Sequence, residues 1–143
     1  HRTAIKTIFT NFSGITKAFD IVPEKLDTAE LPALWTFTSQ APHNKTEYGN
    51  NILSYERIYR IQVAVIPIGQ ATPTLRELKV PPLIESVSEE LEAYPMLKNT
   101  LGVQEANILS DSGIVILPEF GASFVGFEIR LEVRYFHKRV YKE

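Results

Sequence analysis

The stretch that decides the fold is FVGFEIRLEVRYFHK, from Phe124 to Lys138. Its odd positions are apolar or aromatic from Val125 to Tyr135, and its even positions 128 to 134 carry Glu, Arg, Glu and Arg. Successive side chains of a β-strand point to opposite faces. The alternation therefore predicts one long strand with an apolar face in the core and a charged face outside it.

This strand is longer than a chain of this size needs. About 13 residues at 3.4 Å each span roughly 44 Å. A compact chain of 143 residues is only roughly 37 Å across. The stretch from Leu53 to Pro67 is about as long and alternates in the same way. Two such strands must bend or project, and they suggest a protein that contacts its neighbours.

The rest of the chain fits an α+β fold in a single domain over residues 1–143. Helical periodicity marks Arg2 to Phe12 and Leu83 to Tyr94. Short strands are expected at residues 18–22, 33–38, 106–109 and 114–117. We expect a mainly antiparallel sheet, with the N-terminal helix and the central helix packed on one face.

Proline and turn residues set the expected boundaries. Thr72 before Pro73 predicts a helix start. Pro81 and Pro82 predict that a single turn over Arg76 to Lys79 breaks before the central helix. Ser110 to Gly113 has the composition of a hairpin turn between its flanking strands.

Composition narrows the functional classes. The chain has no cysteine, so it lacks disulfides and thiolate nucleophiles, as is usual for assembly in a reducing cytoplasm. We expect neither a signal peptide nor a membrane span, because no apolar run is long enough. The net charge of −2 implies no strongly charged partner by itself.

The charge is unevenly distributed along the chain. Residues 85–119 contain seven acids and one base, and residues 130–143 contain five bases and two acids. Opposite patches permit head-to-tail contact between copies, which can close into a ring. The alternative is a solvated helix and a solvated basic tail, which is the commoner reason for charge runs.

No motif of catalysis or metal binding is found in the sequence. His1, His43 and His137 are far apart, and His43 with Glu47 in a polar loop is the nearest possible ligand pair. Tyr55, Arg57 and Tyr59 are the nearest approach to a nucleic-acid stacking surface, but Tyr59 continues an apolar row and favours the edge of a core. We therefore predict no enzyme activity, no cofactor and no metal.

The order of elements resembles the tail terminator, or tail completion, proteins of tailed bacteriophages. The resemblance covers nearly the whole chain. It rests on the N-terminal helix followed by KLDTAELPALWTF, a polar loop, RIYRIQVAVIP, TPTLREL, LIESVSEELEAYP and SDSGIVILPEFGASFVGFEIRLEVRY.

The resemblance implies a non-enzymatic virion protein that is assembled in the host cytoplasm. It also implies that the copies form a hexameric ring, which caps the tail tube, stops its growth and joins the tail to the neck or head connector. Genome DNA passes through such a ring without sequence-specific recognition, and no membrane is involved. The other interpretations are another neck or baseplate joining protein and, less favoured, a ligand-binding domain or enzyme with a pocket between Leu83–Tyr94 and the sheet.

Two surfaces are candidates for contact with a copy or a partner. The first is the charged row of Glu128, Arg130, Glu132 and Arg134, which is otherwise simply solvated. The second is the long polar loop at residues 40–51, represented by His43, Asn44, Lys45, Glu47 and Tyr48.

Overall fold

The computed structural model, which describes residues 1–39, 46–47, 52–100 and 102–138, has an α+β fold. The helices are α1 (Arg2–Thr10), α2 (Pro73–Glu92) and the short α3 (Glu119–Ala122), with single 3-10 turns at Thr28–Glu30 and Ile68–Gln70. The strands are β1 (Lys17–Ala18), β2 (Ala33–Thr38), β3 (Thr46–Glu47), β4 (Ile52–Pro67), β5 (Val103–Asp111), β6 (Val115–Leu117) and β7 (Phe124–Lys138). The predicted class is confirmed.

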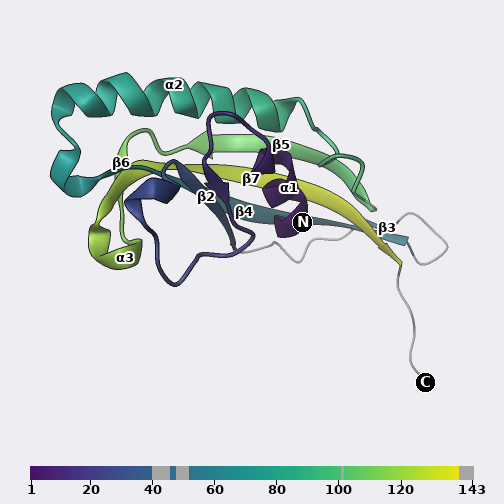
Figure 1. Cartoon of the computed structure of the whole chain (residues 1–143). Helices are drawn as coiled ribbons and strands as arrows, with labels where there is room; N and C mark the ends of the chain where they lie inside the picture. Colours follow the sequence, from purple (N-terminus) through teal and green to yellow (C-terminus); the bar gives the residue numbers. More distant parts are fainter. Residues whose placement is uncertain (40–45, 48–51, 101, 139–143) are drawn as a thin grey trace.

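All seven strands of the described residues belong to one sheet, in the order β1-β2-β4-β7-β5 (Figure 1). β3 pairs with the start of β4, and β6 pairs with the start of β7. The β1–β2 pair is parallel and the other pairs are antiparallel. β7 has the bounds that its alternation predicts, and β2 also has its predicted bounds.

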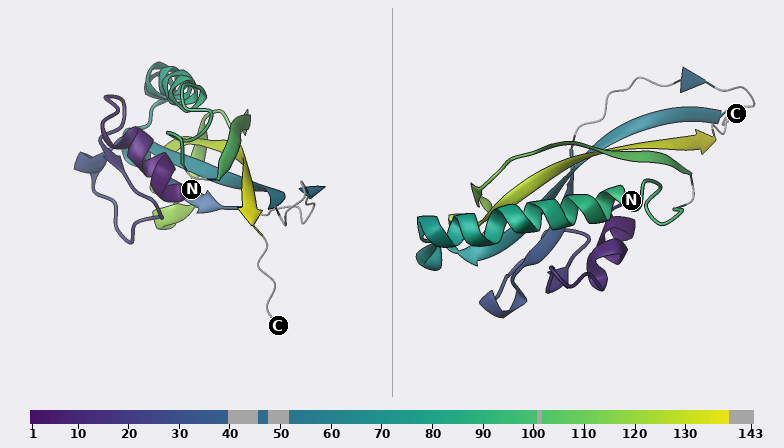
Figure 2. Two further views of the ribbon diagram at one scale, coloured as in Figure 1. Left: turned by 90° about the vertical axis from the view of Figure 1, so that its right-hand side faces the viewer. Right: turned by 90° about the horizontal axis from the view of Figure 1, so that it is seen from above.

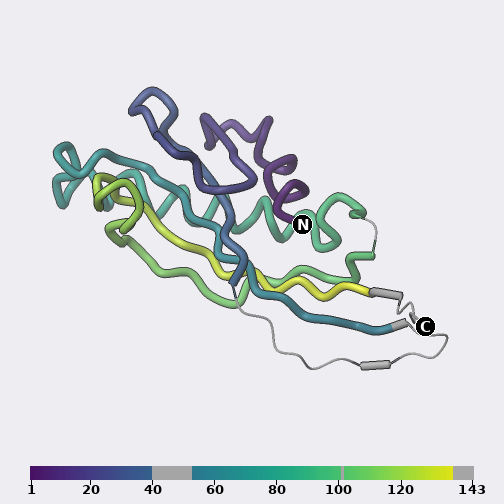
Figure 3. Tube along the Cα trace, turned by 90° about the horizontal axis from the view of Figure 1, so that it is seen from below, coloured from purple at the N-terminus to yellow at the C-terminus, as the bar shows by residue number. Residues whose placement is uncertain are grey.

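The two longest strands form the spine of the molecule. β4 and β7 pair from Ile52 opposite Lys138 to Pro67 opposite Phe124. They run side by side along the molecule (Figure 3). At the end where β4 begins and β7 ends, the pair curves and extends past the end of α2 (Figures 1 and 2). Both outcomes expected from their length, bending and projection, are therefore observed.

One glycine allows β4 and β7 to approach closely. The register of the β4–β7 pair shifts between Ala64, which is opposite Gly126, and Ile66, which is opposite Val125. Such an irregularity bends a strand pair. A Cβ atom on Gly126 would collide with the carbonyl oxygen of Val63. Only glycine fits at this position, so Gly126 has a structural role.

The main core lies between the sheet and the two longer helices. α1 buries Ile5, Ile8 and Phe9, and α2 buries Val80, Leu83, Val87 and Leu91. They join the apolar side of β7, which is Val125, Phe127, Ile129, Leu131 and Val133, each at most 1% exposed. The predicted inward row is confirmed.

A smaller apolar cluster lies apart from this core. Trp35, Leu117 and Phe124 are buried there, and the ring of Phe120 contacts both Trp35 and Phe124 edge-on. It occupies only one end of the sheet, near α3. The remainder of that side carries the even-numbered charged residues of β7, and we call it the open face.

The prediction that Pro81 and Pro82 break the central helix is wrong. α2 is continuous from Pro73 to Glu92, with Thr72 as its N-cap accepting a hydrogen bond from the Leu75 amide at 3.2 Å. A helical proline leaves the carbonyl four residues earlier without a partner. Here those carbonyls belong to Glu77 and Leu78, both on the exposed side, where water can bind them. Burial on both sides of the prolines then holds the helix together.

The predicted hairpin at Ser110 to Gly113 is also wrong. β5 and β6 do not pair with each other, because both pair with β7, one after the other along the same edge. The Gly113 amide donates a hydrogen bond to Oδ1 of Asp111 at 2.9 Å, so these residues do form a turn. This turn connects β5 to β6 without reversing the direction of the chain. The reversal of direction comes later, at α3. Among the described residues, no helix is long and apolar enough to span a membrane.

Candidate interface on the open face

The four charged residues predicted from β7 lie in a row on the open face. Glu128, Arg130, Glu132 and Arg134 alternate with the buried positions of the strand, as expected. Of the second candidate surface, His43, Asn44, Lys45 and Tyr48 lie outside the described residues. Glu47 belongs to β3, where it pairs with Leu53. Contact of either surface with a partner stays a prediction.

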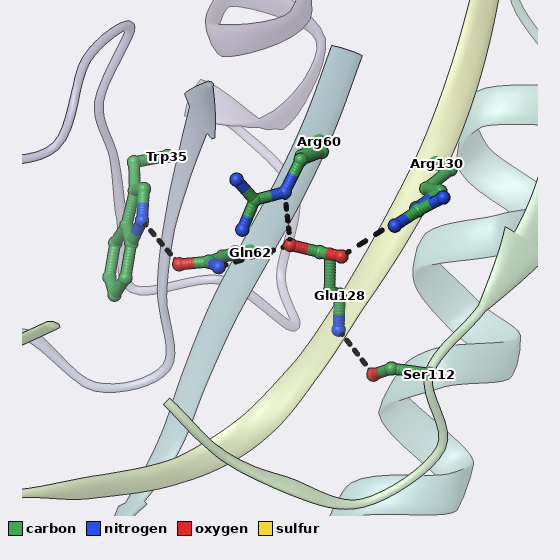
Figure 4. Close-up of polar contacts among 6 residues, drawn as sticks. All are labelled: Trp35, Arg60, Gln62, Ser112, Glu128 and Arg130. Carbon is green, nitrogen blue, oxygen red and sulfur yellow. Dashed lines mark hydrogen bonds and ion pairs between the residues drawn. The ribbon is translucent and has the colours of Figure 1, made fainter. Parts of the chain in front are cut away.

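Glu128 is the centre of a hydrogen-bond network that crosses three strands (Figure 4). Its Oε1 accepts from Nε of Arg60 at 2.7 Å and from Nε2 of Gln62 at 3.1 Å. Oε1 of Gln62 in turn accepts from Nε1 of Trp35 at 3.0 Å. Gln62 is only 2% exposed. This series of hydrogen bonds therefore links Trp35 in the small apolar cluster to Glu128 in the charged row.

The same carboxylate separates two cations. Arg60 and Arg130 are directly opposite each other on β4 and β7, an arrangement that is destabilising for like charges. Glu128 lies between them, with Oε2 at 3.9 Å from Nε of Arg130. The Arg60 guanidinium also lies over the ring of Phe37, 5.3 Å from its centre. Arg60 is therefore held from two sides, whereas Arg130 has one long ionic contact within the described part of the chain.

Further along the row, Arg134 is surrounded by carboxylates. Its Nε lies 3.3 Å from Glu56 and 3.6 Å from Glu132, and its Nη1 lies 3.9 Å from Glu105. These acids come from β4, β7 and β5, so the cluster ties three neighbouring strands together. Reversing the charge of Arg134 would place four acids together and would affect the fold as well as any contact.

The acids and the bases of the row differ in exposure. The Glu128 and Glu132 side chains are 16% and 20% exposed, whereas those of Arg130 and Arg134 are 59% and 44% exposed. The carboxylates therefore act mainly within the protein, and the guanidinium groups form the outermost layer. Alternation in the sequence places all four on one face but cannot show this difference in depth.

Two participants in the network were missed by the sequence analysis. They are Trp35 and Gln62. The signal that could have found them is the register, since Trp35 is opposite Gln62, and Gln62 is opposite Glu128. Register is set by pairing between strands distant in sequence.

Tyr55, Arg57 and Tyr59 do not form an exposed stacking surface. Tyr59 is 7% exposed and belongs to the main core, as its apolar row predicts. Its hydroxyl lies 2.9 Å from Nδ1 of His1. Burial raises the pKa of Tyr59, partly offset by Arg57, while Tyr135 raises it further. The Tyr55 ring stacks on that of Tyr135, with centres 5.6 Å apart.

The pocket expected for a ligand-binding domain has a counterpart near the start of α2. A groove of about 470 Å³ lies between the first half of α2, the end of β4 and the loop before β2. Its walls are mostly apolar, including Leu31, Val65, Leu75 and Leu83, and Lys79 is the one charged residue that lines it among those the structure describes. Within the described part of the chain, no three histidine, aspartate or glutamate side chains are grouped to hold a metal.

Comparison of the chain with protein-family models and with curated protein sequences finds no match. Three features of the structure bear on function: the projecting β4–β7 pair, the layered charges of the β7 row on the open face and the groove at the start of α2.

Proposed function

We propose that this protein is a structural subunit of a phage tail, which forms a ring on the end of the tail tube. The ring ends tube polymerisation and joins the tail to the neck or head connector. The observation that carries the proposal is the β4–β7 pair, 16 and 15 residues long, which continues past the helical layer. The element order of the terminator family supports it as a resemblance.

The projecting pair supports an assembly role because few strands flank it: β3 pairs with Leu53 and Ser54 of β4, and β5 reaches only to Tyr135 of β7. A narrow ribbon of this kind gains from further strands or from packing against another body. The ribbon here carries Tyr55 and Tyr135, which stack on each other, and Phe136, which is 40% exposed. A neighbouring subunit that packs on the open face would cover Phe136.

The charges of the open face suit a protein contact better than DNA binding. Glu56, Glu105, Glu128 and Glu132 oppose Arg60, Arg130 and Arg134, so the face carries a net charge of −1. DNA binding draws on clustered positive charge that neutralises phosphates. Mixed charges instead fix the register and the choice of a partner. In the proposal, DNA passes through the ring without sequence-specific contact.

The remaining parts of the proposal follow from the ring. The partners are other copies of the chain, the tail tube protein and the neck or head connector. The location is the virion, after assembly in the host cytoplasm. The α1–α2 layer on one face of a mainly antiparallel sheet leaves the open face and the ribbon available for these partners. The protein has no enzymatic activity.

Native mass measurement and electron microscopy test the proposal. At micromolar concentration we expect a closed ring with the mass of about six chains, or a ring that forms on added tail tubes. Tubes grown from tail tube subunits should stop growing when the protein is added, and rings should be visible at their ends. A monomer that neither binds the tubes nor limits their length would contradict the proposal.

A further inference from the structure

We infer that the outer side of α2 in one copy docks on the open face of the next copy. The inference rests on the proposed ring and names the two surfaces that meet within it. The first surface, the α2 stripe, consists of Leu78, Pro82, Glu85, Glu89 and Glu92. The second is the exposed arginine layer of the open face, centred on Arg130.

The α2 stripe is an unpartnered helix face with one sign of charge. Its residues recur at intervals of four and three, which places them on one side of a helix. They lie opposite the buried Val80, Leu83, Val87 and Leu91, and all five are exposed. Glu85, Glu89 and Glu92 take part in none of the ion pairs among the described residues.

The open face presents the opposite charge in its outermost layer, although its net charge is slightly negative. Glu128 is engaged by Arg60 and Gln62, and Glu132 lies against Arg134. Along the charged row of β7, an approaching carboxylate therefore meets guanidinium groups first, although Glu105 beside the row is as exposed as Arg134. Arg130 is the most exposed of these guanidinium groups, and its one ionic contact with a described residue is at 3.9 Å, to a carboxylate already bound at 2.7 Å by Arg60. It has the most to gain from a second acid.

The spacing of the two surfaces is compatible with contact. Glu85 and Glu92 are about 10 Å apart along the helix axis, at 1.5 Å per residue. Arg130 and Arg134 are about 13 Å apart along the strand. Long side chains accommodate this difference. Apolar groups flank both charged regions, since Leu78 is 66% exposed on the helix and Phe136 is 40% exposed beyond Arg134. Such groups add area that excludes water from the ion pairs.

The positions of the two surfaces give the contact a direction. α2 covers one side of the sheet and the open face is the other side (Figures 1 and 2). A helix docked on the open face of a neighbour leaves its own open face available for a third copy. Such head-to-tail contacts produce rings when the rotation closes, and they do not produce a two-fold dimer. The contact therefore suits a ring.

Charge reversal with rescue tests the inference. Arg130→Glu alone, and Glu85→Lys, Glu89→Lys and Glu92→Lys together, should each raise the concentration for half-assembly at least about tenfold. All four changes combined should restore it to within about threefold of the unchanged protein. Lys25→Glu, at an exposed position outside both surfaces, is the matched control and should have no effect. Circular dichroism should show the same fold in every variant.

The outcomes separate the two proposals. If the unchanged protein forms rings and either reversal leaves assembly at the control level, the docking inference is wrong and the ring proposal stands. If both reversals weaken assembly but their combination is no better than the weaker one, the two surfaces do not meet and the inference is again wrong. If the unchanged protein forms no ring, alone or on tubes, the proposed function itself fails.

Discussion

The two faces of the β4–β7 pair use the same alternating sequence for different purposes. The inner face of β7 is apolar and buried from Val125 to Val133 beneath α1 and α2. On the open face, the Glu128 and Glu132 side chains of β7 are mostly covered and engaged in ion pairs, whereas those of Arg130 and Arg134 are more exposed. The inner face stabilises the fold by burial, which has no direction. The open face adds directional contacts that can distinguish one partner from another.

The comparison predicts the largest effect on the inner face. Phe127→Ala should lower the free energy of unfolding by about 3–5 kcal/mol, because it removes a fully buried ring and leaves a cavity. Arg130→Ala on the open face should change it by less than about 0.5 kcal/mol. Urea denaturation measures both values. Similar losses in the two variants would show that the faces do not differ in this way.

A smaller effect is expected at Glu128, which has the least exposed side chain of the charged row. Glu128→Gln should lower the free energy of unfolding by about 1.5–3 kcal/mol, since it weakens charged hydrogen bonds and leaves Arg60 facing Arg130 without a carboxylate between them. Glu105→Gln, at a carboxylate 45% exposed and 3.9 Å from its partner, should change it by less than about 0.5 kcal/mol. An equal loss of stability in the two variants would show that Glu128 is not the centre of the network.

The inner face contains one polar group whose removal should help. Thr36 is fully buried, and its hydroxyl has no hydrogen-bond partner within the described residues. Thr36→Val keeps the shape and removes the buried hydroxyl, so thermal unfolding should show a gain of up to about 1 kcal/mol. Thr38→Val, two residues further along β2 and exposed, is the control. A loss of stability in Thr36→Val alone would mean that the hydroxyl is satisfied.

The smallest effect concerns alkaline pH. The pKa of Tyr59 is raised above its ordinary value of 10.0, chiefly by burial, so the folded protein retains the phenol proton longer than the unfolded chain. The stability that the buried, protonated phenol contributes is fully present below pH 10 and is lost as the pH rises through the pKa of Tyr59 in the folded protein. Between pH 9 and pH 11, wild type should lose more stability than Tyr59→Phe. Melting curves at both pH values measure the difference, and equal losses would contradict it.

Prediction from the sequence worked best where one segment carries its own pattern. β7 and β2 have their expected bounds, and α1 ends two residues before the predicted Phe12. It failed where the outcome depends on distant contacts. Pro81 and Pro82 are tolerated because burial on both sides of them outweighs a local cost. β5 and β6 do not form a hairpin because both pair with the same edge of β7.

The candidate site divides in the same manner. The alternation of β7 placed Glu128, Arg130, Glu132 and Arg134 on one face, since the period of a strand is a local property of its backbone. Their different depths depend on what lies opposite each of them. Glu128 is drawn inward by Arg60 and Gln62, residues 68 and 66 positions away, whereas Arg130 faces another arginine and remains exposed.

The amino-acid sequence alone therefore determined the periodicity of each element, the inward and outward sides of the long strands, and the α+β class. Tertiary structure alone decided the register of β4 against β7, the passage of α2 through two prolines and the lower exposure of Glu128 and Glu132 relative to Arg130 and Arg134. The physical reason is that periodicity follows from the geometry of neighbouring residues, whereas register and burial depend on contacts between segments far apart in the chain.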